Sequence, residues 1–170
     1  MIKEAVDDIS RMKRDRDINL KKHEVIKKGC WKKTTSQSLK VGQLIKVSKD
    51  ERVPADLILL YTTEKSGTVF IRTDQLDGET DWKLRRAVSY TQNANAPSRI
   101  HELMGEVTCN PPTNMIYEFE GVYENRAHNV TEPLSLENTL WANTVLASSG
   151  YIIGQVAFTG KQTRAEMNSQ

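Results

Sequence analysis

The apolar residues of this chain come in short runs, and turn-forming residues separate one run from the next. The longest purely apolar run spans residues 57–61. Runs of this length fit strands, whereas an amphipathic helix needs an apolar stripe over ten or more residues. The pattern predicts a mainly β chain, with strands in these segments: 24–27, 30–34, 44–47, 57–61, 68–72, 115–119 and 144–158.

Glycines mark turns in the second half of the chain, and two polar segments, residues 91–97 and 125–132, are predicted surface loops. The glycines are Gly105, Gly121, Gly150, Gly154 and Gly160. Several short strands at such spacing favour a sandwich or a jelly roll. The spacing does not define the order of the strands.

The N-terminal residues follow a different period. Apolar side chains recur there at helical spacing: Ile2, Val6, Ile9 and Met12. Acidic residues come early and basic residues late, as the helix dipole favours. We therefore expect a helical arm over residues 1–19 and a β-rich domain over residues 20–170.

Charge is distributed unevenly along the 170 residues. Residues 1–33 hold eleven Lys or Arg against six Asp or Glu, although the whole chain has a net charge of only +2. The small net charge does not favour nucleic acid as a partner. The basic arm fits either a location near anionic lipid headgroups or a solvated helix face, of which the second is more common.

Three kinds of site or segment are not expected. Cys30 and Cys109 lie far apart without metal-ligand spacing, so we expect free thiols and no metal site. Acidic residues near the N-terminus are unlike a signal peptide. Residues 138–160 carry no charge, but polar residues and glycines interrupt them so often that strands are expected rather than a membrane span.

The segment Asp77-Gly78-Glu79-Thr80 contains the parts of a hydrolytic site. Glu79 can accept a proton, Gly78 permits close approach of another molecule, and Thr80 can orient water. The loop lacks the spacing of a P-loop or an EF-hand. Its acidity would repel a phosphate unless Mg²⁺ or cationic groups came from elsewhere. Taken alone, such a four-residue pattern is most often a solvated turn.

The wider segment, residues 72–85, resembles the catalytic loop of the actuator domain in phospholipid-translocating P-type ATPases. Four further segments are similar to that family in the same order: residues 41–47, 53–57, 109–121 and 154–164. Cation pumps carry Thr-Gly-Glu-Ser at the loop, so Asp77-Gly78-Glu79-Thr80 resembles the lipid-transporting version. The variations at 72–75 and 81–83 resemble an endosomal and trans-Golgi subgroup.

The resemblance implies a distorted jelly-roll actuator domain on the cytosolic face of an integral membrane protein. Its loop would promote hydrolysis of an aspartyl-phosphate held by the phosphorylation domain, with Glu79 as base or water-orienting group, Gly78 and Thr80 assisting, and Asp77 shaping the loop. Contacts between this domain and the phosphorylation or nucleotide-binding domain would involve Trp82, Lys83 and Arg85.

ATP, Mg²⁺, the membrane domain and phospholipid would belong to the full-length enzyme, since the chain lacks the Asp-Lys-Thr-Gly segment that carries the phosphoryl group. We therefore expect no cofactor bound by this chain and no ATP hydrolysis by it alone. Two alternatives stay open: a noncatalytic β-rich module that binds membranes or proteins, and the actuator of a cation-transporting P-type ATPase.

Overall fold

The computed structural model describes residues 21–27, 29–94, 99 and 102–168. The helical arm predicted over residues 1–19 lies outside the described residues. Within them the strands are β1 (Lys22–Lys27), β2 (Cys30–Thr35), β3 (Leu44–Ser48), β4 (Asp56–Thr62), β5 (Thr68–Arg72), β6 (Trp82–Arg86), β7 (Glu106–Cys109), β8 (Glu120–Asn125), β9 (Val130–Ser135), β10 (Thr139–Leu140), β11 (Val145–Leu146) and β12 (Tyr151–Phe158).

The described helices are all short. The α-helices are α2 (Asp74–Asp77), α3 (Ser89–Gln92) and α4 (Arg164–Asn168), and the 3-10 helices are η1 (Ser36–Ser38), η3 (Arg126–His128), η4 (Leu136–Asn138) and η5 (Gly160–Gln162). The prediction of a mainly β chain is confirmed for the described residues. None of the helices in this part of the chain is long and apolar enough to cross a membrane.

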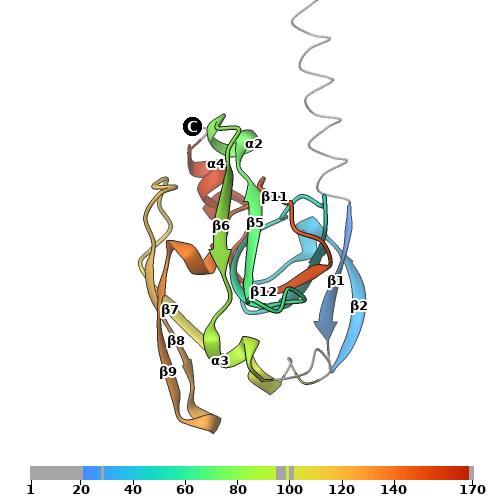
Figure 1. Cartoon of the computed structure of the whole chain (residues 1–170), viewed down its shortest axis with the longest axis vertical. Coiled ribbons are helices and arrows are strands. Elements are labelled where there is room, and N and C mark those ends of the chain that lie inside the picture. The colour runs from blue at the N-terminus through green and yellow to red at the C-terminus, as the bar shows by residue number, and fades with distance from the viewer. Residues whose placement is uncertain (1–20, 28, 95–98, 100–101, 169–170) are drawn as a thin grey trace, which may run out of the picture.

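The strands form three antiparallel sheets (Figure 1). The largest has six strands in the order β10-β4-β12-β3-β1-β2, and the two smaller sheets have the orders β11-β5-β6 and β7-β8-β9. The uncharged residues 138–160 contain β10, β11 and β12, which confirms the prediction of strands there. In Figure 1 the β7–β9 sheet and the β1–β2 hairpin lie on opposite sides of the molecule.

Strand β4 is buried on both faces of the six-stranded sheet. Alternate side chains of a strand point to opposite faces, and the alternate residues of β4 accordingly enter two different cores. Leu57 and Leu59 pack in one core with Val69 and Ile71 of β5. Ile58 and Leu60 pack in a second core with Tyr123 and Trp141. This explains why the longest apolar run of the sequence shows no alternation with polar residues.

Residues 115–119 are not the strand that their sequence predicts. They form a turn before β8, which begins at Glu120. The carbonyl oxygens of this turn accept hydrogen bonds from side chains instead of a neighbouring strand: Trp141 Nε1 donates to Ile116, and Arg164 donates to Met115 and Glu118. Similarly, the predicted loop at 125–132 contains η3 and the start of β9.

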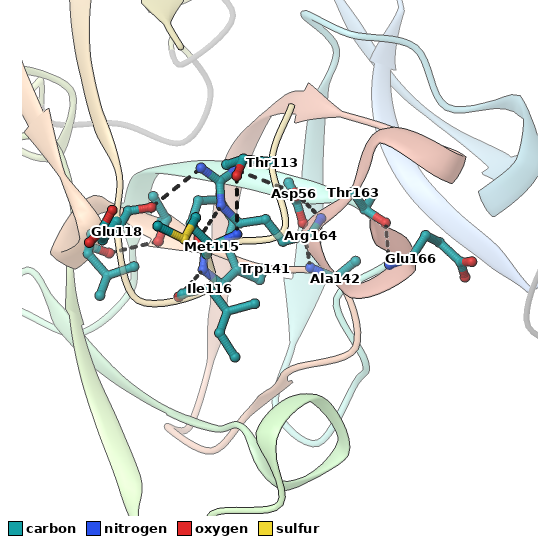
Figure 2. A network of polar contacts seen from close by, with 12 residues as sticks. Asp56, Thr113, Met115, Ile116, Glu118, Trp141, Ala142, Thr163, Arg164 and Glu166 are labelled. Atoms are coloured by element: carbon teal, nitrogen blue, oxygen red, sulfur yellow. Dashed lines mark hydrogen bonds and ion pairs between the residues drawn. The ribbon is translucent and has the colours of Figure 1, made fainter. Parts of the chain in front are cut away.

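Asp56, the first residue of β4, connects this strand to the C-terminal part of the chain (Figure 2). Its carboxylate accepts the backbone N–H groups of Ala142 and Arg164, each at 2.9 Å. Arg164 Nη1 lies 4.0 Å from the same carboxylate. Burial raises the pKa of Asp56 to about 6, although these N–H groups and the guanidinium of Arg164 oppose the rise. Asp56 thereby fixes the start of α4 against the six-stranded sheet.

Candidate functional site

The Asp-Gly-Glu-Thr segment lies at the end of the ribbon that β5 and β6 form within the β11-β5-β6 sheet. β5 and β6 pair antiparallel from Thr68 opposite Arg86 to Arg72 opposite Trp82, so residues 73–81 form the connection between them. Figure 1 shows α2, which begins this connection, at the top of the ribbon. Residues 78–81 are exposed. The ribbon therefore presents Gly78, Glu79 and Thr80 to solvent, while Asp77 is partly buried.

Gly78 ends helix α2 in a left-handed conformation. Its φ and ψ are 76° and −4°, and its N–H bonds to the carbonyl oxygen of Asp74 at 2.9 Å. Glycine adopts this conformation without the steric cost that other residues meet. A Cβ built at Gly78 would meet no atom within 4 Å. The positive φ explains the glycine here, and the open space beside it is free for another molecule.

Asp77 organises the connection through both oxygens of its carboxylate. Oδ1 accepts a bond from Thr73 Oγ1 at 3.1 Å and one from the backbone N–H of Glu79 at 2.9 Å. Oδ2 accepts a bond from the hydroxyl of Tyr117 at 3.1 Å. Charged acceptors make stronger hydrogen bonds than neutral ones. Asp77 is therefore committed to holding the backbone at Glu79.

Glu79 reaches into solvent with an ion pair to one neighbour. Its side chain is 47% exposed, and Oε2 lies 2.5 Å from Nζ of Lys83. The hydrogen bond that Lys83 donates to Glu79, with further carboxylates nearby, raises the pKa of Lys83. Thr80, the neighbour of Glu79, is exposed. Glu79 is thus accessible to an incoming group, while Lys83 holds one oxygen of its carboxylate.

The three residues predicted to contact other domains have different environments. Trp82 is 59% exposed. Lys83 is half-buried beside Glu79, as described above. Arg85 is only 9% exposed, and burial lowers its pKa. Because Trp82 and Arg85 are three residues apart on β6, they lie on opposite faces of the strand. The outer face of the ribbon therefore offers Trp82 to a partner and not Arg85.

Sequence reasoning missed the companions of Trp82 on that outer face. Phe70 is 44% exposed and Leu84 is 45% exposed. They sit opposite one another in the ladder, and the rings of Phe70 and Trp82 are 6.0 Å apart. The two-residue spacing of Trp82 and Leu84 was the available signal, because residues i and i+2 of a strand share a face.

The acidic side chains of the loop do not form a metal site. Asp77 is occupied by its three donors and Glu79 by Lys83. Across the residues that the structure describes, no group of three or more His, Cys, Asp or Glu could hold a metal ion. Cys30 and Cys109 are both free thiols. Mg²⁺ does not fit this loop taken by itself.

Known proteins have sequences similar to this chain over almost its whole length. The chain is 50% identical to "Phospholipid-transporting ATPase NEO1" of Saccharomyces cerevisiae and 43% identical to "Probable phospholipid-transporting ATPase IIB" of Homo sapiens, over 171 residues in each comparison. Each match covers 99% of the chain but only 14% and 15% of those relatives. The chain thus spans about one seventh of their length. No protein-family model matches the chain.

A solved structure shares the fold. The crystal structure of a zinc-transporting PIB-type ATPase in the E2.Pi state superimposes with a TM-score of 0.51 over 89% of this chain and 16% of that one. At 12% identity the likeness concerns the fold alone. The level of sequence identity and its extent along the chain carry the assignment: this chain corresponds to one segment of the phospholipid-transporting ATPases.

Proposed function

We propose that the chain is the actuator domain of a phospholipid-transporting P-type ATPase. Its loop promotes hydrolysis of the aspartyl-phosphate on another domain and so couples that step to lipid translocation. The observation that carries the proposal is an exposed Glu79 whose backbone N–H is held by Asp77 at the end of a ribbon. The three-sheet fold is assigned to the distorted jelly roll of actuator domains, with residues 20–170 as the domain and residues 1–19 as its arm.

In the proposed reaction Glu79 accepts a proton from the water that attacks the phosphoryl group, or orients that water. A positioned base of this kind typically contributes about 10²–10⁴ in rate. Gly78 leaves room for the partner domain, and Thr80 holds the water through its hydroxyl. Asp77 keeps the main chain of Glu79 in place. Each role fits the position of the residue in the loop.

The ion pair with Lys83 has to open when the loop docks. Lys83 and Glu79 are partly exposed, and exposed pairs of this kind are weak enough to exchange partners. Opening frees the carboxylate of Glu79 for water and leaves the ammonium of Lys83 next to the incoming phosphate. Because no group of three or more His, Cys, Asp or Glu among the described residues could hold a metal ion, Mg²⁺ would arrive with the phosphorylated domain.

The other properties of the proposed enzyme come from the longer relatives and lie outside this segment. Its partners would be the phosphorylation, nucleotide-binding and membrane domains of the same polypeptide, with ATP and Mg²⁺ bound by the first two. Phospholipid as the transported substrate is supported by the names of the relatives. The cytosolic face of an endosomal or trans-Golgi membrane is the location that we propose for the chain.

The test uses the full-length ATPase with Glu79→Gln, which keeps the size of the side chain and removes the base. Phosphoenzyme should form from labelled ATP at the normal rate and then decay about 10²–10⁴ times more slowly. Asp81→Asn is the matched control, because it removes an equal charge from the same exposed loop. A normal decay rate in Glu79→Gln, or an equal loss in the control, would reject the role of Glu79.

A second candidate function is contact with an anionic membrane surface. The observation that favours it is a set of exposed lysines on and next to the β1–β2 hairpin: Lys21, Lys22, Lys27, Lys32 and Lys33. Each lysine near an anionic bilayer contributes about 1 kcal/mol. Sedimentation of the chain with phosphatidylserine vesicles, but not with neutral phosphatidylcholine vesicles, is expected. Equal recovery with both lipids would exclude this function.

A further inference from the structure

A second segment of the chain reaches the candidate loop from outside the ribbon. Tyr117 belongs to the turn before β8, and its hydroxyl donates to Asp77 Oδ2 at 3.1 Å across a separation of 40 residues. The other oxygen of the same carboxylate accepts the backbone N–H of Glu79. One carboxylate thus links the tyrosine to the backbone of the proposed base.

The turn that carries Tyr117 is anchored on both sides of the tyrosine. Trp141 Nε1 donates to the carbonyl oxygen of Ile116 at 2.9 Å. Arg164 donates from Nε to Met115 at 3.0 Å and from Nη2 to Glu118 at 3.4 Å. Figure 2 shows these carbonyl groups converging with the side chains of Arg164 and Trp141. The backbone around Tyr117 is therefore held by side chains and not by a strand ladder.

The anchoring side chains themselves belong to the buried body of the molecule. The side chain of Arg164 is 3% exposed, and its guanidinium carbon lies 4.0 Å from the centroid of the Trp141 ring. Trp141 is 1% exposed. Asp56 at the start of β4 accepts the backbone N–H of Arg164. A continuous set of contacts therefore connects the six-stranded sheet to the turn and, through Tyr117, to the loop.

We propose that Tyr117 is a positioning residue for Glu79: its hydroxyl fixes the carboxylate of Asp77, which in turn fixes the backbone of the base. The proposal rests on the proposed function of Glu79. The loop continues from the ends of β5 and β6, with β11 paired to β5 at Arg72. A base must be held to within a fraction of an ångström to act well. Tyr117, itself 57% exposed, adds a further contact from the anchored turn before β8.

The functional test compares Tyr117→Phe with the wild type in the full-length ATPase. The substitution keeps the ring and removes only the hydroxyl. Phosphoenzyme should form normally and decay about tenfold more slowly, in line with the loss of one hydrogen bond to a charged group. Tyr61→Phe is the matched control, because Tyr61 lies on β4 and its ring packs near Tyr151 instead. Normal decay in Tyr117→Phe overturns the proposal.

A double substitution separates this proposal from the proposed function. If Tyr117 acts through Glu79, then adding Tyr117→Phe to Glu79→Gln should slow decay no further, since interacting residues are not additive. A further tenfold loss in the double variant shows that Tyr117 acts by another route and overturns the proposal. Normal decay in Glu79→Gln alone would instead remove the proposed function on which it rests.

A third measurement does not depend on catalysis. Hydrogen exchange at the backbone amide of Glu79 reports the bond to Asp77 directly. In the 170-residue chain, Tyr117→Phe should speed exchange at this amide several-fold while the unfolding midpoint stays unchanged. Unchanged exchange at Glu79 would show that Asp77 holds the backbone without help and would overturn the positioning role.

Discussion

Replacing Arg164 with alanine tests whether the C-terminal anchor stabilises the domain as its contacts indicate. The substitution removes a guanidinium that stacks 4.0 Å from the Trp141 ring centroid at 3% side-chain exposure. A cation–π contact in such a desolvated site is worth about 2 kcal/mol. The charged hydrogen bond to Met115 at 3.0 Å adds roughly 1.5 kcal/mol, and the longer bond to Glu118 adds less.

These contributions predict that Arg164→Ala lowers the free energy of unfolding by about 4 kcal/mol. This agrees with the range of ~3–5 kcal/mol for removing one partner of a buried ion pair. It is a large part of the ~5–15 kcal/mol that holds a typical domain together. The assay is urea unfolding of the 170-residue chain, followed by circular dichroism.

Arg126→Ala provides the comparison for this prediction. Like Arg164 with Asp56, Arg126 pairs with a carboxylate, that of Glu106 at 3.6 Å, but its side chain is 81% exposed. A surface pair contributes about 0–1 kcal/mol, so Arg126→Ala should change the unfolding free energy little. A loss below about 1 kcal/mol for Arg164→Ala, or equal losses in the two variants, would refute the argument from burial.

Two other predictions concern stability. Burial raises the pKa of Asp56 from 3.8 to about 6. Because the pKa is higher in the folded state, the contribution of Asp56 to the free energy of unfolding is fully present below about pH 4 and is lost as the pH rises through 6. The loss from this group is about 3 kcal/mol. Urea unfolding of wild type and Asp56→Asn from pH 4 to pH 7 should show it as a change in the difference between their unfolding free energies. A difference that stays constant with pH contradicts the shift in pKa. Gly78→Ala should lower the unfolding free energy by about 1–2 kcal/mol, because φ is 76° there while a Cβ would meet no atom; thermal unfolding measures this, and an unchanged midpoint would contradict the backbone argument.

The sequence predicted those strands whose apolar runs and flanking turn residues lie within a few positions of each other. β1 to β5 lie where short apolar runs alternate with turn residues, because each of those signals acts within a few positions. The turn at residues 115–119 was predicted wrongly for the opposite reason. Its composition suits a strand, but its carbonyl groups are taken by Trp141 and Arg164, which lie 25 and 49 residues further along the chain from Ile116 and Met115. Contacts at that separation leave no local pattern.

The same limit applies to the candidate loop. The chemistry of Glu79 and the shaping role of Asp77 follow from residue type and resemblance, and remain predictions for catalysis. The hydrogen bond from Tyr117 to Asp77 could not be predicted from the sequence, since it joins residues 40 positions apart. By contrast, the burial of Arg85 could have been anticipated, because a separation of three residues on a strand places it on the face opposite Trp82.

The acidity of the loop gains a physical explanation from these contacts. Asp77 is turned inward as an acceptor for three donors, and Lys83 offsets the charge of Glu79. The loop can therefore carry carboxylates close together without strong repulsion among them. On our proposal, an approaching phosphoryl group offers Lys83 a more highly charged acceptor than the single carboxylate of Glu79. On our proposal, docking itself would then draw Lys83 away and release the base only when its substrate is present.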